Sequence, residues 1–93
     1  MLDDEIAIAV VKTCIRVIGG LTTGDHIRLQ NKLDDLRIKT APQVRQLSVR
    51  IVEMLFNLPS PHKLDVGFLG GIDTSNTVNE VVEIVAVNSD RNI

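Results

Sequence analysis

Seven polar residues recur at helical spacing between residues 28 and 50 of this 93-residue chain: Arg28, Lys32, Asp35, Lys39, Gln43, Gln46 and Arg50. Steps of three and four residues would place them along one edge of an α-helix, over roughly 33 Å. Cations at this spacing could contact the phosphates of a nucleic-acid duplex, and the glutamines could reach its sugars. The same cations could instead form a solvated face with intrahelical pairs, so the pattern leaves both interpretations open.

Residues suited to catalysis or metal binding are few and separated. His26 and His62 lie far apart, and the single cysteine, Cys14, lies among apolar residues, where a thiol is usually buried and unreactive. Asp34 and Asp35 adjoin cations, which favours a solvated acidic pair. No Cys/His spacing fits a zinc site, and neither Gly-Gly pair fits a phosphate-binding loop. We therefore expect neither an enzyme nor a metal or cofactor site.

The composition indicates one small domain with an aliphatic core. Hydrophobic residues make up 44% of the chain, which has two Phe and neither Trp nor Tyr. The missing aromatic residues disfavour stacking on single strands more than recognition of a duplex by shape. The net charge is −2, but residues 25–58 carry six cations and four acids, so that this segment is locally positive.

The sequence also indicates where the protein acts. A single cysteine excludes a disulfide framework, which fits an intracellular setting. Lys12 and Arg16 interrupt the longest apolar run, and the chain opens on acidic residues rather than a basic leader. We expect a cytoplasmic protein with no membrane span.

An apolar ladder beside the polar residues predicts a long helix over residues 25–58. Its members recur at helical spacing and include Leu29, Leu33, Leu36, Val44, Leu47, Ile51 and Met54. Pro42 interrupts the stretch, and a proline ring costs about 3 kcal/mol inside a helix. Because the ladder keeps its phase across Pro42, one kinked helix is favoured over two helices at 25–40 and 42–58. We expect the ladder to form both the core and the interface of a homodimer.

The flanking segments complete an antiparallel helical hairpin. Residues 3–18 carry a wide apolar face, Asp3 or Asp4 can cap this helix, and Gly19-Gly20 ends it. A link of about four residues then makes the first two helices antiparallel neighbours. The loop over 59–76 is expected to tuck four apolar side chains against the hairpin: Leu64, Val66, Phe68 and Leu69.

The C-terminal part is expected to add one short element. Thr77 and Glu80 form a capping box, which predicts a helix over 78–87, although its valines also suit a strand. Residues 88–93 are expected to fray. The predicted fold is therefore all-α, with the hairpin and its following loop over 1–72 and the short helix or strand and tail over 73–93. Two copies of this single domain would form a four-helix bundle.

Four stretches of the chain resemble the small RNA-silencing suppressors of insect nodaviruses. They are Leu33–Leu36, Leu47–Val52 with Leu55, Pro59-Ser60 and Val66–Gly71, and their order and spacing fit over residues 17–71. Members of that family are helical homodimers that bind double-stranded RNA along its length without sequence preference. The resemblance implies that the long helix carries the RNA-contacting cations, with Arg50 at a matching position and Lys39 at a looser one.

Two functions are consistent with this sequence. The resemblance implies a viral protein that shields double-stranded RNA from a processing nuclease and so suppresses silencing in the host cytoplasm. Its partners would be the duplex, a second copy and a host silencing protein, with RNA contacts from Arg28, Lys32, Lys39, Gln43, Gln46 and Arg50. The alternative is a small helical regulator, an anti-activator or adaptor, which covers a helix of a protein partner and binds no nucleic acid.

Overall fold

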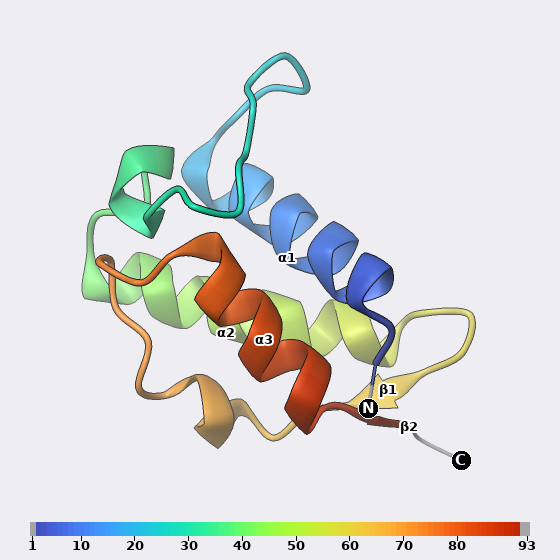
Figure 1. The fold of residues 1–93 in the computed structure, drawn as a ribbon. Coiled ribbons are helices and arrows are strands. Elements are labelled where there is room, and N and C mark those ends of the chain that lie inside the picture. Colours follow the sequence, from blue (N-terminus) through green and yellow to red (C-terminus); the bar gives the residue numbers. More distant parts are fainter. Residues whose placement is uncertain (1, 92–93) are drawn as a thin grey trace.

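Three α-helices carry the fold of residues 2–91, the part of the chain that the computed structural model describes (Figure 1). They are α1 (Asp4–Gly19), α2 (Ala41–Phe56) and α3 (Val78–Asn88). Two short 3₁₀ helices, η1 (Leu33–Leu36) and η2 (Val66–Leu69), lie between them, and β1 (His62–Lys63) pairs with β2 (Asp90–Arg91). The predicted helical class is confirmed, with a small two-stranded sheet in addition.

Helix α1 begins and ends within one residue of the predicted bounds. The Asp3 carboxylate accepts a hydrogen bond from the Glu5 backbone N–H at 2.9 Å, as expected of an N-cap. At the other end, Gly20 adopts a left-handed conformation with φ 66°, which glycine reaches without a steric cost. The predicted glycine stop is therefore confirmed.

The prediction of a long helix over residues 25–58 is wrong. Helix α2 begins only at Ala41, and Pro42 lies in its first turn, where the missing N–H has no intrahelical partner to lose. Thr40 caps the helix by accepting from the Gln43 backbone N–H at 3.3 Å, and the Gln43 side chain accepts from the Thr40 N–H at 3.1 Å. Pro42 thus marks the start of a helix rather than a kink within one.

Residues 21–40 contain no α-helix, only the 3₁₀ helix η1, because several of their backbone groups pair with residues elsewhere in the chain. The N–H of Leu33 donates to the carbonyl of Asn76 at 3.0 Å, and the N–H of Val78 donates to the carbonyl of Asn31 at 2.9 Å. These bonds join the segment to the start of α3 and replace the hydrogen bonds of a helix. The alternative of two helices therefore fits α2 but fails for 25–40.

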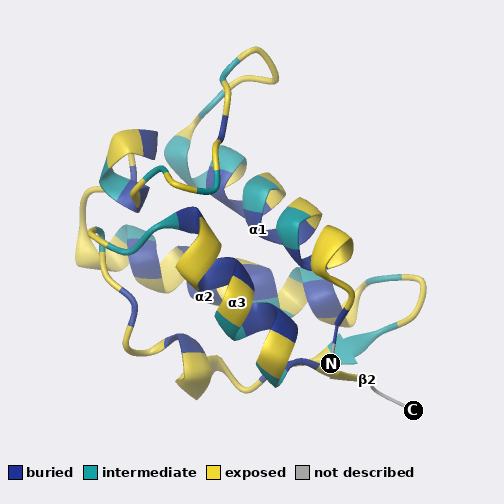
Figure 2. Ribbon diagram, viewed as in Figure 1, coloured by how far each residue is buried: buried dark blue, intermediate teal, exposed yellow. Residues whose placement is uncertain are grey.

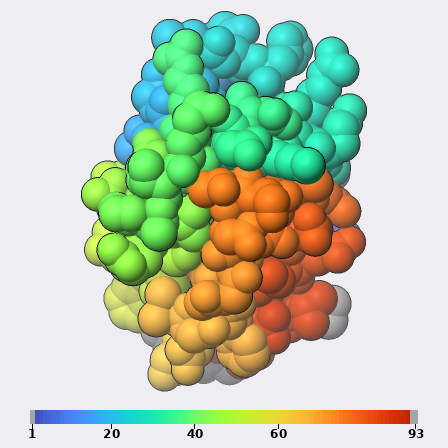
Figure 3. Space-filling view, turned by 90° about the vertical axis from the view of Figure 1, so that its left-hand side faces the viewer, coloured from blue at the N-terminus to red at the C-terminus, as the bar shows by residue number. Residues whose placement is uncertain are grey.

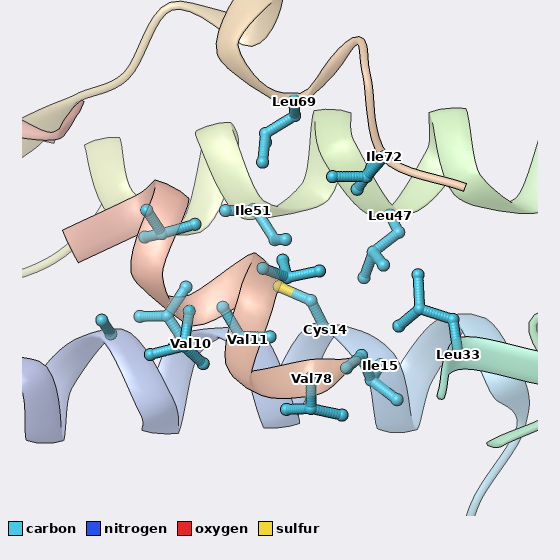
Figure 4. Packing of buried hydrophobic residues seen from close by; sticks show 14 of the residues in the cluster. Val10, Val11, Cys14, Ile15, Leu33, Leu47, Ile51, Leu69, Ile72 and Val78 are labelled. Atoms are coloured by element: carbon cyan, nitrogen blue, oxygen red, sulfur yellow. The ribbon is translucent and has the colours of Figure 1, made fainter. Parts of the chain in front are cut away.

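Within one chain, most of the apolar ladder nevertheless lies in the core. Leu33, Leu36, Val44, Leu47 and Ile51 are buried, while Leu29 and Met54 are half-buried against the core. Helices α1 and α2 run in opposite directions (Figure 1), and α3 packs against α1. The sides of these helices that face one another are buried (Figure 2), and Leu33, Leu47 and Ile51 lie in the core between them (Figure 4). Since one chain buries the ladder by itself, a second copy would have to use another surface.

The C-terminal part combines a confirmed helix with two corrections. Thr77 and Glu80 form the predicted capping box, and α3 extends one residue beyond the predicted end. Leu64 and Leu69 are buried, but Val66 and Phe68 are about half exposed, so only two of the four loop residues tuck in. The tail is not frayed as far as Arg91, because β2 pairs with β1. Residues 92–93 lie outside the described residues.

Candidate functional site

The structure does not align the six predicted RNA-binding residues along one helix. Arg28 lies in the loop after α1, Lys32 precedes η1, and Lys39 precedes the cap of α2. Only Gln43, Gln46 and Arg50 are on α2. The expected basic edge of roughly 33 Å is therefore not formed, since a helix of 16 residues is about 24 Å long.

The Gln43 side chain forms hydrogen bonds to the backbone that precedes α2. Its side-chain oxygen accepts from the Lys39 backbone N–H at 2.8 Å, and its amide nitrogen donates to the Arg37 carbonyl at 3.0 Å. These bonds connect the preceding segment to the first turn of α2. Gln43 is therefore occupied as a cap and is half-buried.

The predicted cations keep their charged ends free. In residues 2–91, the side-chain hydrogen bonds donated by cations come from Arg16 and Arg91. Four exposed cations thus donate no side-chain hydrogen bond within that part of the chain: Arg28, Lys32, Lys39 and Arg50. Their side chains are available to an anion, but they belong to different segments of the chain and not to one helix.

Apolar residues do gather on the side of α2 that faces away from the core. Pro42, Val49 and Phe56 follow one another at seven-residue steps, which places them in one line along the helix. Val49 is 50% exposed and Phe56 55% exposed. Together with Arg45, Gln46, Val52 and Glu53 they form a surface that we call the outer face of α2.

A groove borders the outer face on each side. The first, of about 690 Å³, lies between α2 and residues 66–74, and its apolar lining includes Val49, Val66 and Ile72. Figure 3 shows the first half of α2 beside this segment. The second groove, of about 540 Å³, is lined by Ile18 of α1 and by α2. A third hollow, of about 500 Å³, lies beside Phe56 and β1.

The charges around the outer face are mixed. Arg45 and Glu53 stand four residues before and after Val49, and both line the second groove. The first groove adds Lys39 and Asp73. A bound segment would therefore meet apolar contacts along its centre and charges of both signs at the edges, an arrangement that selects a partner by electrostatic complementarity.

The remaining reactive groups have structural surroundings. Cys14 is buried as predicted, with its Sγ 3.9 Å from the Met54 Sδ (Figure 4). Burial raises the pKa of the Cys14 thiol to about 11, so the thiol stays protonated near neutral pH. His26 is exposed in the loop after α1, whereas His62 lies in β1 with its Nδ1 2.9 Å from the Ser60 carbonyl oxygen.

Three carboxylates stabilise loops and caps. Asp25, Asp73 and Glu80 each have a lowered pKa, because each accepts hydrogen bonds from nearby residues. Asp25 accepts from the Thr22 backbone N–H at 2.7 Å, and Glu80 accepts from the Thr77 backbone N–H at 2.9 Å. Such bonds favour the ionised form and hold the turn in place.

Neither the rest of the described chain nor the comparisons adds a further site. None of the family models, curated proteins and solved structures compared with this chain matches it. Within residues 2–91, no group of three or more His, Cys, Asp or Glu side chains is arranged to hold a metal ion. No helix in that range has the length and hydropathy needed to cross a membrane. Among residues 2–91, the outer face of α2 combines exposed apolar side chains with adjoining grooves.

Apart from Gln46, the outer face of α2 was not among the residues predicted from the sequence, because the apolar ladder on the opposite side of the helix was expected to form the dimer interface. The signal was present in the seven-residue spacing of Pro42, Val49 and Phe56 on the opposite side of the helix. Two seven-residue steps form a weak pattern. Only the position of the core shows that the line of Pro42, Val49 and Phe56 is exposed and that the apolar ladder is the buried side of α2.

Proposed function

We propose that this chain is a helical interaction module that binds a helix of a protein partner on the outer face of α2. The observation that carries the proposal is the exposed line of Pro42, Val49 and Phe56, at whose centre Val49 lines a groove on each side. A helix laid along this line would bury apolar surface on both molecules, which stabilises a complex by roughly 25 cal/mol per Å² removed from water.

A capture experiment tests this function. The purified chain is immobilised, and its stoichiometric protein partner is recovered after nuclease treatment. Val49→Asp places a charge in the centre of the outer face and should abolish capture. The matched control is Val87→Asp, because Val87 is 62% exposed on α3 and lies outside the proposed surface. Equal capture by both variants, each checked for its fold by circular dichroism, would contradict the proposal.

Binding of double-stranded RNA is a second candidate function, and the free cations favour it. Arg28, Lys32, Lys39 and Arg50 are exposed, and phosphate contacts need no aromatic residues. In this function the chain would shield a duplex from a nuclease and so suppress RNA silencing. It ranks second because these cations lie on different segments of a chain whose net charge is −2.

A gel-shift titration tests the second candidate. Binding of a duplex should weaken steeply with salt, and the slope should fall by about one for each phosphate contact removed. Arg50→Ala and Lys39→Ala should each weaken binding, whereas Lys63→Ala serves as the control because Lys63 lies in β1. Absence of binding at low salt would exclude this function.

A further inference from the structure

We infer that the helix bound on the outer face of α2 is α2 of a second copy, in an antiparallel arrangement centred on Val49. This inference rests on the proposed function of that face and names its partner. In a two-fold symmetric contact, the same surface appears on both molecules, so each residue must suit its counterpart in the other copy. On the outer face of α2 this condition is met by Val49 with itself, by Pro42 with Phe56 and by Arg45 with Glu53, whereas Gln46 would lie opposite Val52.

The apolar residues match across the two-fold axis. In an antiparallel pair, a residue that precedes Val49 by a given number meets the residue that follows it by the same number. Val49 therefore meets Val49, and Pro42 meets Phe56 of the second copy, as Phe56 meets its Pro42. All three residues are exposed in the single chain, so pairing removes them from water.

The charged residues match in the same way. Arg45 precedes Val49 by four residues and Glu53 follows it by four, so each arginine lies opposite a glutamate and the contact contains two ion pairs. A parallel arrangement would instead place Arg45 beside Arg45 and Glu53 beside Glu53. Because like charges in an interface repel, the charges select the antiparallel arrangement.

The size of the surface indicates a weak dimer. One pair of helices about 24 Å long buries less than the roughly 1,200 Å² of a stable interface. Val66, which is 48% exposed on the wall of the first groove, can add to the contact. We expect a transient dimer that forms at high protein concentration, as small interfaces do.

Charge reversal tests the arrangement through the mass in solution. Light scattering of the wild type, up to about 1 mM, should show a mass rising from that of one chain, 10.2 kDa, toward twice that value. Arg45→Glu and Glu53→Arg should each weaken association at least tenfold, because each creates two like-charge pairs. The double variant Arg45→Glu/Glu53→Arg should restore it. Both positions are exposed, so the fold should tolerate these changes.

A cysteine on the axis gives an independent readout. Cys14 is buried, so Val49→Cys adds the one accessible thiol of residues 2–91. On mild oxidation this variant should form a disulfide-linked dimer, since residues on the axis face each other closely enough for a disulfide. Val87→Cys on α3 is the control and should stay monomeric at the same concentration.

The outcomes separate the inference from the proposed function. A wild type that remains monomeric at about 1 mM, or a double variant that fails to recover the dimer, overturns the antiparallel pair. If Val49→Asp still abolishes capture of another protein in that case, the proposed function stands with a different partner. If the chain neither self-associates nor loses a partner on Val49→Asp, both are overturned.

Discussion

Residues 25–40 and residues 41–56 share one apolar spacing, yet only the second segment is an α-helix. Both bury leucines in the same core: Leu33 and Leu36 lie in η1, and Leu47 lies in α2. The first segment pairs its backbone with residues before α3, whereas the second begins with a capping box at Thr40. The comparison teaches that apolar spacing identifies buried residues, while caps and backbone partners decide where a helix forms.

The largest predicted effect is a loss of stability when a buried leucine is shortened, and it should be similar in residues 25–40 and in residues 41–56. Leu33→Ala and Leu47→Ala remove side chains that are each 0% exposed, so each should lower the free energy of unfolding by about 2–5 kcal/mol. Urea denaturation followed by circular dichroism measures both. Val49→Ala on the exposed face is the control, with a change within about 0.5 kcal/mol. If only Leu33→Ala had a small effect on the free energy of unfolding, the two segments would not contribute equally to the core.

The backbone at the end of η1 approaches the end of α1 closely at Gly19. A methyl group on Gly19 would meet the backbone carbonyl oxygen of Leu36 well inside van der Waals contact. Gly19→Ala should therefore force the end of α1 and η1 apart and destabilise the protein by about 1–3 kcal/mol. Thermal denaturation measures the change. Gly71→Ala is the matched control, because a methyl group there meets open space, and an equal effect of both would contradict this close approach.

A smaller effect distinguishes a helix start from a kinked helix. Thr40→Ala removes the N-cap of α2 and should cost about 1 kcal/mol. Pro42→Ala should change stability by well under that amount, since proline is tolerated in a first turn. If Pro42 instead interrupted a continuous helix, the same substitution would stabilise the protein by about 3 kcal/mol. Chemical denaturation of the two variants decides between these structures.

The smallest effect is a local response to acid. The pKa of Asp25 is lowered, mainly by the hydrogen bond from the Thr22 backbone, so this stabilisation is present above pH 3.8 and is lost as the pH falls below it. The cap formed by Thr40 and Gln43 contains no ionisable group. Amide hydrogen exchange is measured from pH 6 to pH 3 and corrected for the intrinsic rate. The Thr22 amide should lose protection as the pH falls, whereas the protection of the Gln43 amide should stay unchanged. Equal loss at both amides would contradict this difference.

The sequence predicted the helices whose ends carry local signals. Asp3 and Gly20 delimit α1, and Thr77 with Glu80 starts α3, because each of these contacts lies within a few residues. The segment 25–40 could not be predicted in the same way. Its conformation depends on hydrogen bonds to residues more than forty positions away, such as that between Leu33 and Asn76, and no helical spacing reveals them.

The candidate site could be predicted only in part. The ladder from Leu33 to Ile51 was correctly expected in the core, but burial within one chain removed it as a dimer interface. The cations were correctly expected at the surface, but their common edge depended on a helix that does not form. The exposure of Pro42, Val49 and Phe56 could be recognised only once the buried side of α2 was known.

The central claim is that the outer face of α2 binds a helix of a protein, and a dilution series followed by nuclear magnetic resonance tests it most directly. Between about 1 mM and 10 µM, backbone amide shifts should change with concentration at Arg45, Val49, Glu53 and Phe56, while those of Glu83 and Val87 on α3 stay constant. Shifts that are independent of concentration along α2, and equally unaffected by any captured protein partner, would contradict the claim.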